Sequence, residues 1–92
     1  MIGEDPGDPF CRYALGLEYA SDPQRVEDAI EVFEGLRKDQ PDYLPTYYQL
    51  ALLLKSMGRT TDFIQVVNEG KVLASSTGQN KVYTELDFLL FD

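Results

Sequence analysis

The chain has 92 residues, enough for one small domain. Its 16 acidic and 8 basic residues give a net charge of −8, which disfavours binding to nucleic acid or to an anionic membrane and favours a basic partner. The simpler explanation of this acidity is solubility or adaptation to a salty cytoplasm. Cys11 is the single cysteine, which excludes a disulfide within the chain and fits a reducing compartment.

The first ten residues are acidic and hold no apolar run, which is unlike a secretory signal, and no stretch approaches the length of a membrane span. We therefore expect a soluble, cytoplasmic protein. Residues 1–7 show no periodicity and are predicted to form a disordered tail.

The pairs Asp8-Pro9 and Asp22-Pro23 each combine a capping aspartate with a proline suited to the first helical position, so each predicts a helix start. The second of these helices places apolar residues three and four positions apart: Val26, Ile30, Phe33 and Leu36. Pro41 is expected to end this part of the chain.

A third helix is predicted from about Leu44 to Gly58, a typical C-terminal stop. A fourth follows Arg59-Thr60, where Thr60 can act as the N-cap, and ends before residues 75–79. A last helix is predicted from about Asn80 to Phe91.

The apolar spacing occurs twice. Three residues of the first helix recur 35 positions later and three of the second recur 34 positions later, in the pairs Leu15/Leu50, Gly16/Ala51, Tyr19/Leu54, Ile30/Ile64, Phe33/Val67 and Leu36/Gly70. A period near 34 with two amphipathic segments per unit is typical of stacked helix-turn-helix repeats. The pattern predicts an all-α fold with two antiparallel helical repeats and a C-terminal capping helix.

These residues resemble the tetratricopeptide repeat family, whose unit carries W-x2-L-G-x2-Y, then A-x3-F, then P. The first repeat supplies Leu15, Gly16, Tyr19, Ala29, Phe33 and Pro41, with Arg12 at the tryptophan position. The second keeps the pattern of the first helix but has Phe63 where the family prefers alanine. The resemblance implies a fragment of a right-handed α-solenoid with repeats at 8–41 and 42–76 and a capping helix at 77–92; the alternative is an unrelated helical bundle.

The resemblance also implies binding of a protein or peptide on the concave face formed by the first helix of each repeat. The matching positions are Phe10, Tyr13, Leu17, Tyr48, Leu52 and Lys55. Tyr13 and Tyr48 are the strongest candidates, because tyrosine offers apolar area and a hydroxyl group; alternatively, both pack against the last helix. With Lys55 as the one cation, an apolar or basic ligand suits this face better than an acidic tail.

The last helix has a second candidate surface. Val82, Leu86, Leu89 and Leu90 share one side, whereas Phe88 and Phe91 point away from it. Such a patch often marks self-association, so we predict a possible homodimer through Phe88 and Phe91. The alternative is fraying or a local fold-back of this segment.

The sequence has no histidine, which removes the commonest general base and metal ligand. Glu27 and Glu31 are helical neighbours, but such pairs are mostly a solvated face, and no calcium-loop or phosphate-binding pattern is present. We therefore expect no catalysis, no cofactor and no metal. The sequence predicts a non-catalytic adaptor; the rival functions are a structural, self-associating subunit and an enzyme.

Overall fold

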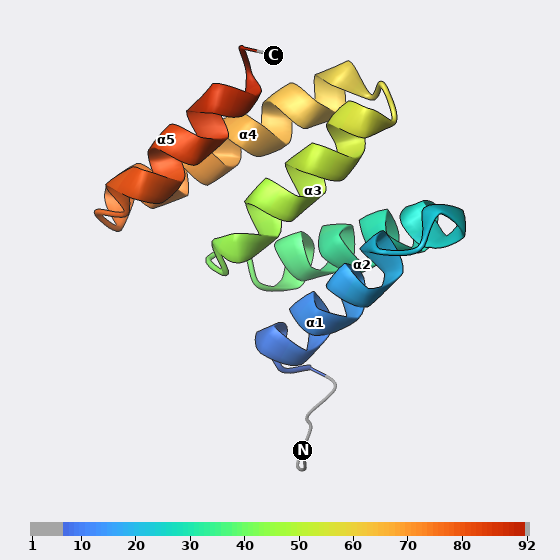
Figure 1. The fold of residues 1–92 in the computed structure, drawn as a ribbon. Coiled ribbons are helices and arrows are strands. Elements are labelled where there is room, and N and C mark those ends of the chain that lie inside the picture. Colours follow the sequence, from blue (N-terminus) through green and yellow to red (C-terminus); the bar gives the residue numbers. More distant parts are fainter. Residues whose placement is uncertain (1–6, 92) are drawn as a thin grey trace. The chain divides into compact units, whose positions relative to one another are not determined.

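The computed structural model describes residues 7–91, which form five α-helices and one short 3-10 helix, with no strand among them (Figure 1). The chain divides into two compact units, Met1–Thr46 and Tyr47–Asp92. The division falls within the first turn of the third helix, and each unit has buried apolar residues of its own. An all-α fold is thereby confirmed. Of the disordered tail predicted at 1–7, residues 1–6 lie outside the described residues.

The first unit contains α1 (Pro9–Ala20), the 3-10 helix η1 (Pro23–Arg25) and α2 (Val26–Asp39). Asp8 caps α1 as predicted, because its side chain accepts a hydrogen bond from the Phe10 backbone N–H at 2.8 Å. Asp22 accepts from the Gln24 N–H at 2.9 Å, but the helix that it opens is η1, and α2 begins only at Val26. The second Asp-Pro pair therefore starts a 3-10 turn that leads into the predicted helix.

α1 packs closely on α2 at Gly16, the buried residue of α1. A Cβ atom at Gly16 would lie 2.5 Å from Cε1 of the Phe33 ring, a distance that no unstrained contact allows. Phe33 itself is fully buried, together with Ala29 and Leu36 on the same face of α2. The small residue expected at this position thus makes room for an aromatic ring of the neighbouring helix.

The second unit contains most of α3 (Pro45–Ser56), α4 (Thr60–Ser76) and α5 (Asn80–Leu89). Gly58 and Gly78 separate these helices, with φ of 74° and 73°, a conformation that favours glycine. The prediction that Thr60 caps α4 is wrong in detail. Thr60 is the first residue of α4, and Arg59 at the cap position makes no side-chain capping hydrogen bond.

The helices of the second unit meet at Gly70 of α4. A Cβ atom there would lie 2.8 Å from Cδ1 of Leu86 on α5 and 2.8 Å from Cβ of Tyr47 on α3. Leu86 is fully buried, and Phe63 is also buried in spite of its size. The close approach between α3 and α4 therefore occurs at Gly70. Phe63 is buried at a different position on α4 and does not prevent this approach.

The helices lie within the spans predicted for the two repeats and the capping helix: α1 and α2 within 8–41, α3 and α4 within 42–76, and α5 within 77–92. The division into these domains stays a prediction. None of the described helices combines the length and apolar character needed to cross a membrane.

Candidate functional site

Three of the predicted binding residues lie along one side of α1. Phe10, Tyr13 and Leu17 follow the spacing of three and four residues that brings side chains onto one helix face. Phe10 is 66% exposed and Leu17 is also exposed, whereas Tyr13 is half-buried. This side of α1 therefore presents apolar groups to solvent at Phe10 and Leu17.

Tyr13 belongs partly to the core of the first unit. Its ring lies 5.9 Å from that of Phe33 and 5.8 Å from that of Tyr43, centroid to centroid, with an edge-on arrangement against Tyr43. Burial raises the pKa of the Tyr43 phenol, and Tyr13 and Asp8 add to this shift. No sequence pattern indicates the contribution of Tyr43, which follows α2 and lies outside the helical repeat pattern.

The other three predicted residues lie on α3. Tyr48, Leu52 and Lys55 follow one another at spacings of four and three; Leu52 is exposed, and the other two are half-buried. The prediction that the α1 and α3 residues share one concave face concerns the two units together and stays a prediction.

Lys55 makes contacts within the second unit. Its Nζ donates a hydrogen bond to the backbone carbonyl of Leu89 at 2.8 Å and lies 5.6 Å from the centroid of the Phe63 ring. Leu89 is the last residue of α5, so the ammonium group offsets the negative end of that helix. Its predicted role in partner binding stays a prediction, and the structure adds a second role in holding α5.

α5 is attached to α4 by a mixture of apolar and charged contacts. Leu86 is fully buried, and Nζ of Lys71 lies 2.7 Å from Oδ1 of Asp87 and 5.2 Å from the Tyr83 ring centroid. This hydrogen bond to Asp87 raises the pKa of Lys71. The side of α5 that carries Leu86 therefore closes the second unit, as the apolar spacing predicts.

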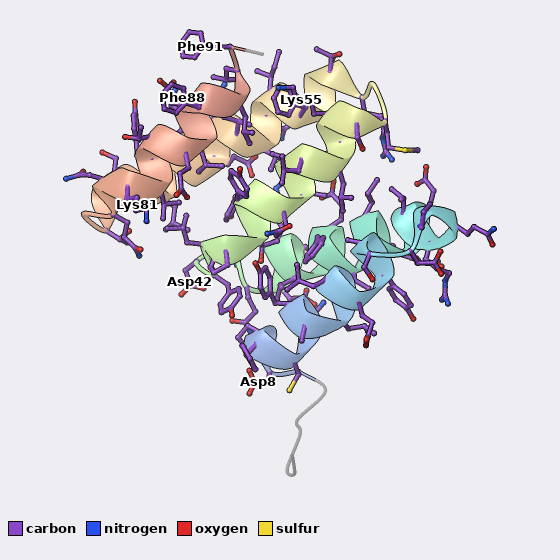
Figure 2. The ribbon with its side chains drawn as sticks, viewed as in Figure 1. Asp8, Asp42, Lys55, Lys81, Phe88 and Phe91 are labelled. Atoms are coloured by element: carbon purple, nitrogen blue, oxygen red, sulfur yellow. The ribbon has the colours of Figure 1, made fainter. Side chains whose placement is uncertain are left out.

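Phe88 lies on the side of α5 away from α4, and Phe91 lies beyond the C-terminal end of α5 (Figure 2). They are 68% and 75% exposed, and Phe91 is the second residue after the end of the helix. The expectation that these rings do not pack against the unit agrees with these positions; the homodimer itself stays a prediction.

A surface pocket of about 290 Å³ lies between the C-terminal end of α5 and the start of α4, and we call it the α5-end pocket. Its lining is mainly apolar and comprises Lys55, Thr60, Phe63, Ile64, Leu89 and Leu90. No local sequence pattern indicates this pocket, because its walls come from three helices. In the described part of the chain, no group of three or more acidic or cysteine side chains is placed to hold a metal ion.

Comparison with known proteins shows which solved structures share this fold. No family model and no curated protein matches the chain. Among solved structures, the chain is similar to a tetratricopeptide repeat domain protein from Salinibacter ruber. The solution NMR structure of that protein has a TM-score of 0.85 and 38% identity, with 94% of this chain and 86% of the other covered.

The crystal structure from Salinibacter ruber has a TM-score of 0.80 and 36% identity, and the match covers 89% of this chain and 90% of the other. Repeat domains of this kind are generally non-catalytic protein-interaction modules. Identity of this level over nearly the full length of both chains shows that this chain belongs to the tetratricopeptide repeat family.

Proposed function

We propose that the chain is a non-catalytic adaptor that binds another protein through the outward side chains of α1 and α3, the helices that the family resemblance assigns to the concave face. The observation that carries this proposal is the apolar side of α1, where Phe10 and Leu17 remain exposed. Aromatic and aliphatic groups of this kind contribute strongly to binding when a partner removes them from water.

The charge of the first unit supports a basic or apolar partner. Residues 1–46 hold eleven acidic and four basic residues, and three of those four cations form ion pairs within the unit: Arg12 with Asp39, Arg25 with Asp28, and Arg37 with Glu34. The excess negative charge would attract a basic segment and repel an acidic one. Binding of a basic partner should weaken with rising salt, because exposed charges are screened over about 8–10 Å at physiological ionic strength.

The proposal is tested by affinity capture from the source lysate followed by quantitative mass spectrometry. The variant Leu17→Ser/Leu52→Ser removes exposed apolar groups from both helices and spares Tyr13, which the core of the first unit uses. Leu15→Ser/Val72→Ser is the matched control. Leu15 and Val72 are also exposed aliphatic residues, but they are not among the predicted binding residues. A protein bound by the wild type and the control and lost from the first variant supports the proposal.

Equal recovery of every captured protein by the two folded variants would reject binding through these side chains. Tyr13→Phe/Tyr48→Phe then tests the hydroxyl groups separately, since it keeps both rings. A loss of partner with this variant would show that the tyrosine hydroxyls take part in recognition.

Self-association is a second candidate function, favoured by the exposure of Phe88 and Phe91 beside a helix whose other face is buried. Sedimentation across a concentration series tests it directly, and a purely monomeric profile would exclude it.

A further inference from the structure

The α5-end pocket and the exposed Phe91 lie at the same end of the second unit. The pocket is lined by Leu89 and Leu90, and Phe91 is the next residue along the chain. Phe91 is not part of the lining and stays 75% exposed, so its ring lies outside the pocket beside it. The unit therefore carries an unfilled apolar pocket and an uncovered aromatic ring close together.

The pocket is large enough for a phenyl ring. An apolar cavity of about 150 Å³ can hold benzene, and this pocket measures about 290 Å³. The Phe63 ring in its wall offers an aromatic contact, and Ile64, Leu89 and Leu90 offer aliphatic ones. A phenylalanine ring therefore matches the pocket in size and in chemistry.

We infer that two copies of the chain associate about a two-fold axis, each placing Phe91 in the α5-end pocket of the other. This inference rests on the second candidate function, self-association, and names the residues that carry it. A surface that holds both a projecting ring and a pocket for it is self-complementary, which is what a symmetric dimer requires.

The charge of the chain favours this end for a contact between identical copies. Residues 47–92 hold five acidic and four basic residues, whereas residues 1–46 hold eleven and four. Two copies that meet through the nearly neutral unit avoid most of the repulsion between their acidic units. In addition, the hydrogen bond from Lys55 to the Leu89 carbonyl offsets the negative end of α5, so two such helix ends can approach each other.

The test is sedimentation of the purified chain from about 10 μM to about 1 mM, a range suited to the weak association expected of a small interface. We expect the wild type to show a concentration-dependent dimer. Phe91→Ser should raise the dimer dissociation constant roughly a hundredfold, about tenfold for each of the two rings removed from the interface. Leu15→Ser is the matched control, because Leu15 is also an exposed apolar residue, at 45%, but lies on α1 outside the predicted binding residues and the α5-end pocket, and it should leave the dimer unchanged.

The pocket is tested separately. Ile64→Ser weakens the apolar lining without changing the charge, and Val72→Ser is its control on the same helix, exposed and outside the pocket. We expect Ile64→Ser to weaken the dimer and Val72→Ser to leave it intact. A mixture of the Phe91→Ser and Ile64→Ser chains should form more dimer than either chain alone. In the mixed dimer, the intact Phe91 ring of the Ile64→Ser chain can enter the intact pocket of the Phe91→Ser chain.

The results of these experiments distinguish insertion of Phe91 into the pocket from self-association in general and from partner binding. A dimer that Phe91→Ser or Ile64→Ser leaves unchanged, or a mixture no more associated than its components, would overturn ring insertion and leave self-association standing. A monomer at every concentration would overturn both. Neither result bears on partner binding through α1 and α3, since the substitutions that test it, at Leu17 and Leu52, lie outside the α5-end pocket.

Discussion

Gly16 shows how one missing atom sets the distance between two helices. The Phe33 ring occupies the space where any other residue would place its Cβ, and Phe33 is fully buried, so the ring cannot turn out into solvent. This glycine lies within α1, away from any turn, and it allows α1 to pack closely against α2.

Gly16→Ala should therefore destabilise the protein by about 1–3 kcal/mol, the usual cost of overpacking a core. Urea unfolding followed by circular dichroism measures this change. Gly35→Ala is the control on α2: its Cβ would meet only the flexible end of Arg12, at 3.0 Å, so the higher helix propensity of alanine should leave stability unchanged or raise it by up to about 1 kcal/mol. Equal destabilisation by both substitutions would contradict the packing argument.

At Thr46, by contrast, a substitution should raise the stability of the protein. Thr46 is fully buried, and in the described part of the chain its Oγ1 is the one buried side-chain polar atom without a hydrogen-bond partner. Thr46→Val replaces the hydroxyl with a methyl group of similar size and should stabilise the protein by about 1 kcal/mol. Thermal unfolding of the two proteins checks this, and a lower melting temperature for the variant would show that the hydroxyl has a role.

Two polar contacts attach α5 to the other helices of the second unit. Lys71 connects it to α4 through Asp87, and Lys55 connects its end to α3 through the Leu89 carbonyl. Asp87→Asn should weaken the attachment of α5 by about 0.5–1 kcal/mol, as expected for a partly exposed ion pair. Hydrogen exchange of the α5 amides measures the loss, and Glu85→Gln, which removes an exposed acid from the same helix, should leave exchange unchanged.

The same ion pair predicts a dependence on alkaline pH. The pKa of Lys71 lies above its ordinary value of 10.5, chiefly because of the hydrogen bond to Asp87, so the folded chain holds this proton more tightly than the unfolded chain does. The stabilisation is fully present below the unfolded-state pKa and is lost as pH rises through the folded-state pKa. Urea unfolding at a series of pH values should show a steeper decline in the free energy of unfolding above 10.5 for the wild type than for Asp87→Asn. Identical profiles would contradict the coupling.

The sequence predicted the helices well where local signals are strong. Asp8-Pro9 starts α1, Gly58 ends the turn after α3, and the apolar spacing of α5 separates buried Leu86 from exposed Phe88. These features depend on a few neighbouring residues. The start of α4 was misplaced by one residue, because a threonine is suited both to the cap and to the first turn.

The candidate site was less predictable, because its contacts join residues far apart in the sequence. Lys55 and Leu89 are 34 positions apart, and no local pattern indicates that they meet. Tyr13 is on the predicted side of α1, but the sequence does not reveal that Tyr43 packs against it. The α5-end pocket exists only once α3, α4 and α5 are assembled.

For the molecule as a whole, the uneven charge is the feature with the broadest effect. Most of the excess negative charge belongs to residues 1–46, and a net charge far from zero opposes compaction through self-repulsion. Added sodium chloride should therefore stabilise the folded chain by up to about 1 kcal/mol as it screens this repulsion. Thermal unfolding across a salt series measures the effect, and a melting temperature that falls with salt would show that the ion pairs outweigh the repulsion.

Gly70 of α4 lies where α3, α4 and α5 pack together. Because Tyr47 and Leu86 both press on the space above this one α-carbon, any side chain there would push α3 and α5 away from α4 at the same time. Natural variation at this position should consequently be narrow. A smaller residue at position 86 would relieve one contact, but every residue except glycine at position 47 keeps the Cβ atom that causes the other. The close packing of α3, α4 and α5 therefore depends on Gly70 having a hydrogen atom where every other residue has a side chain.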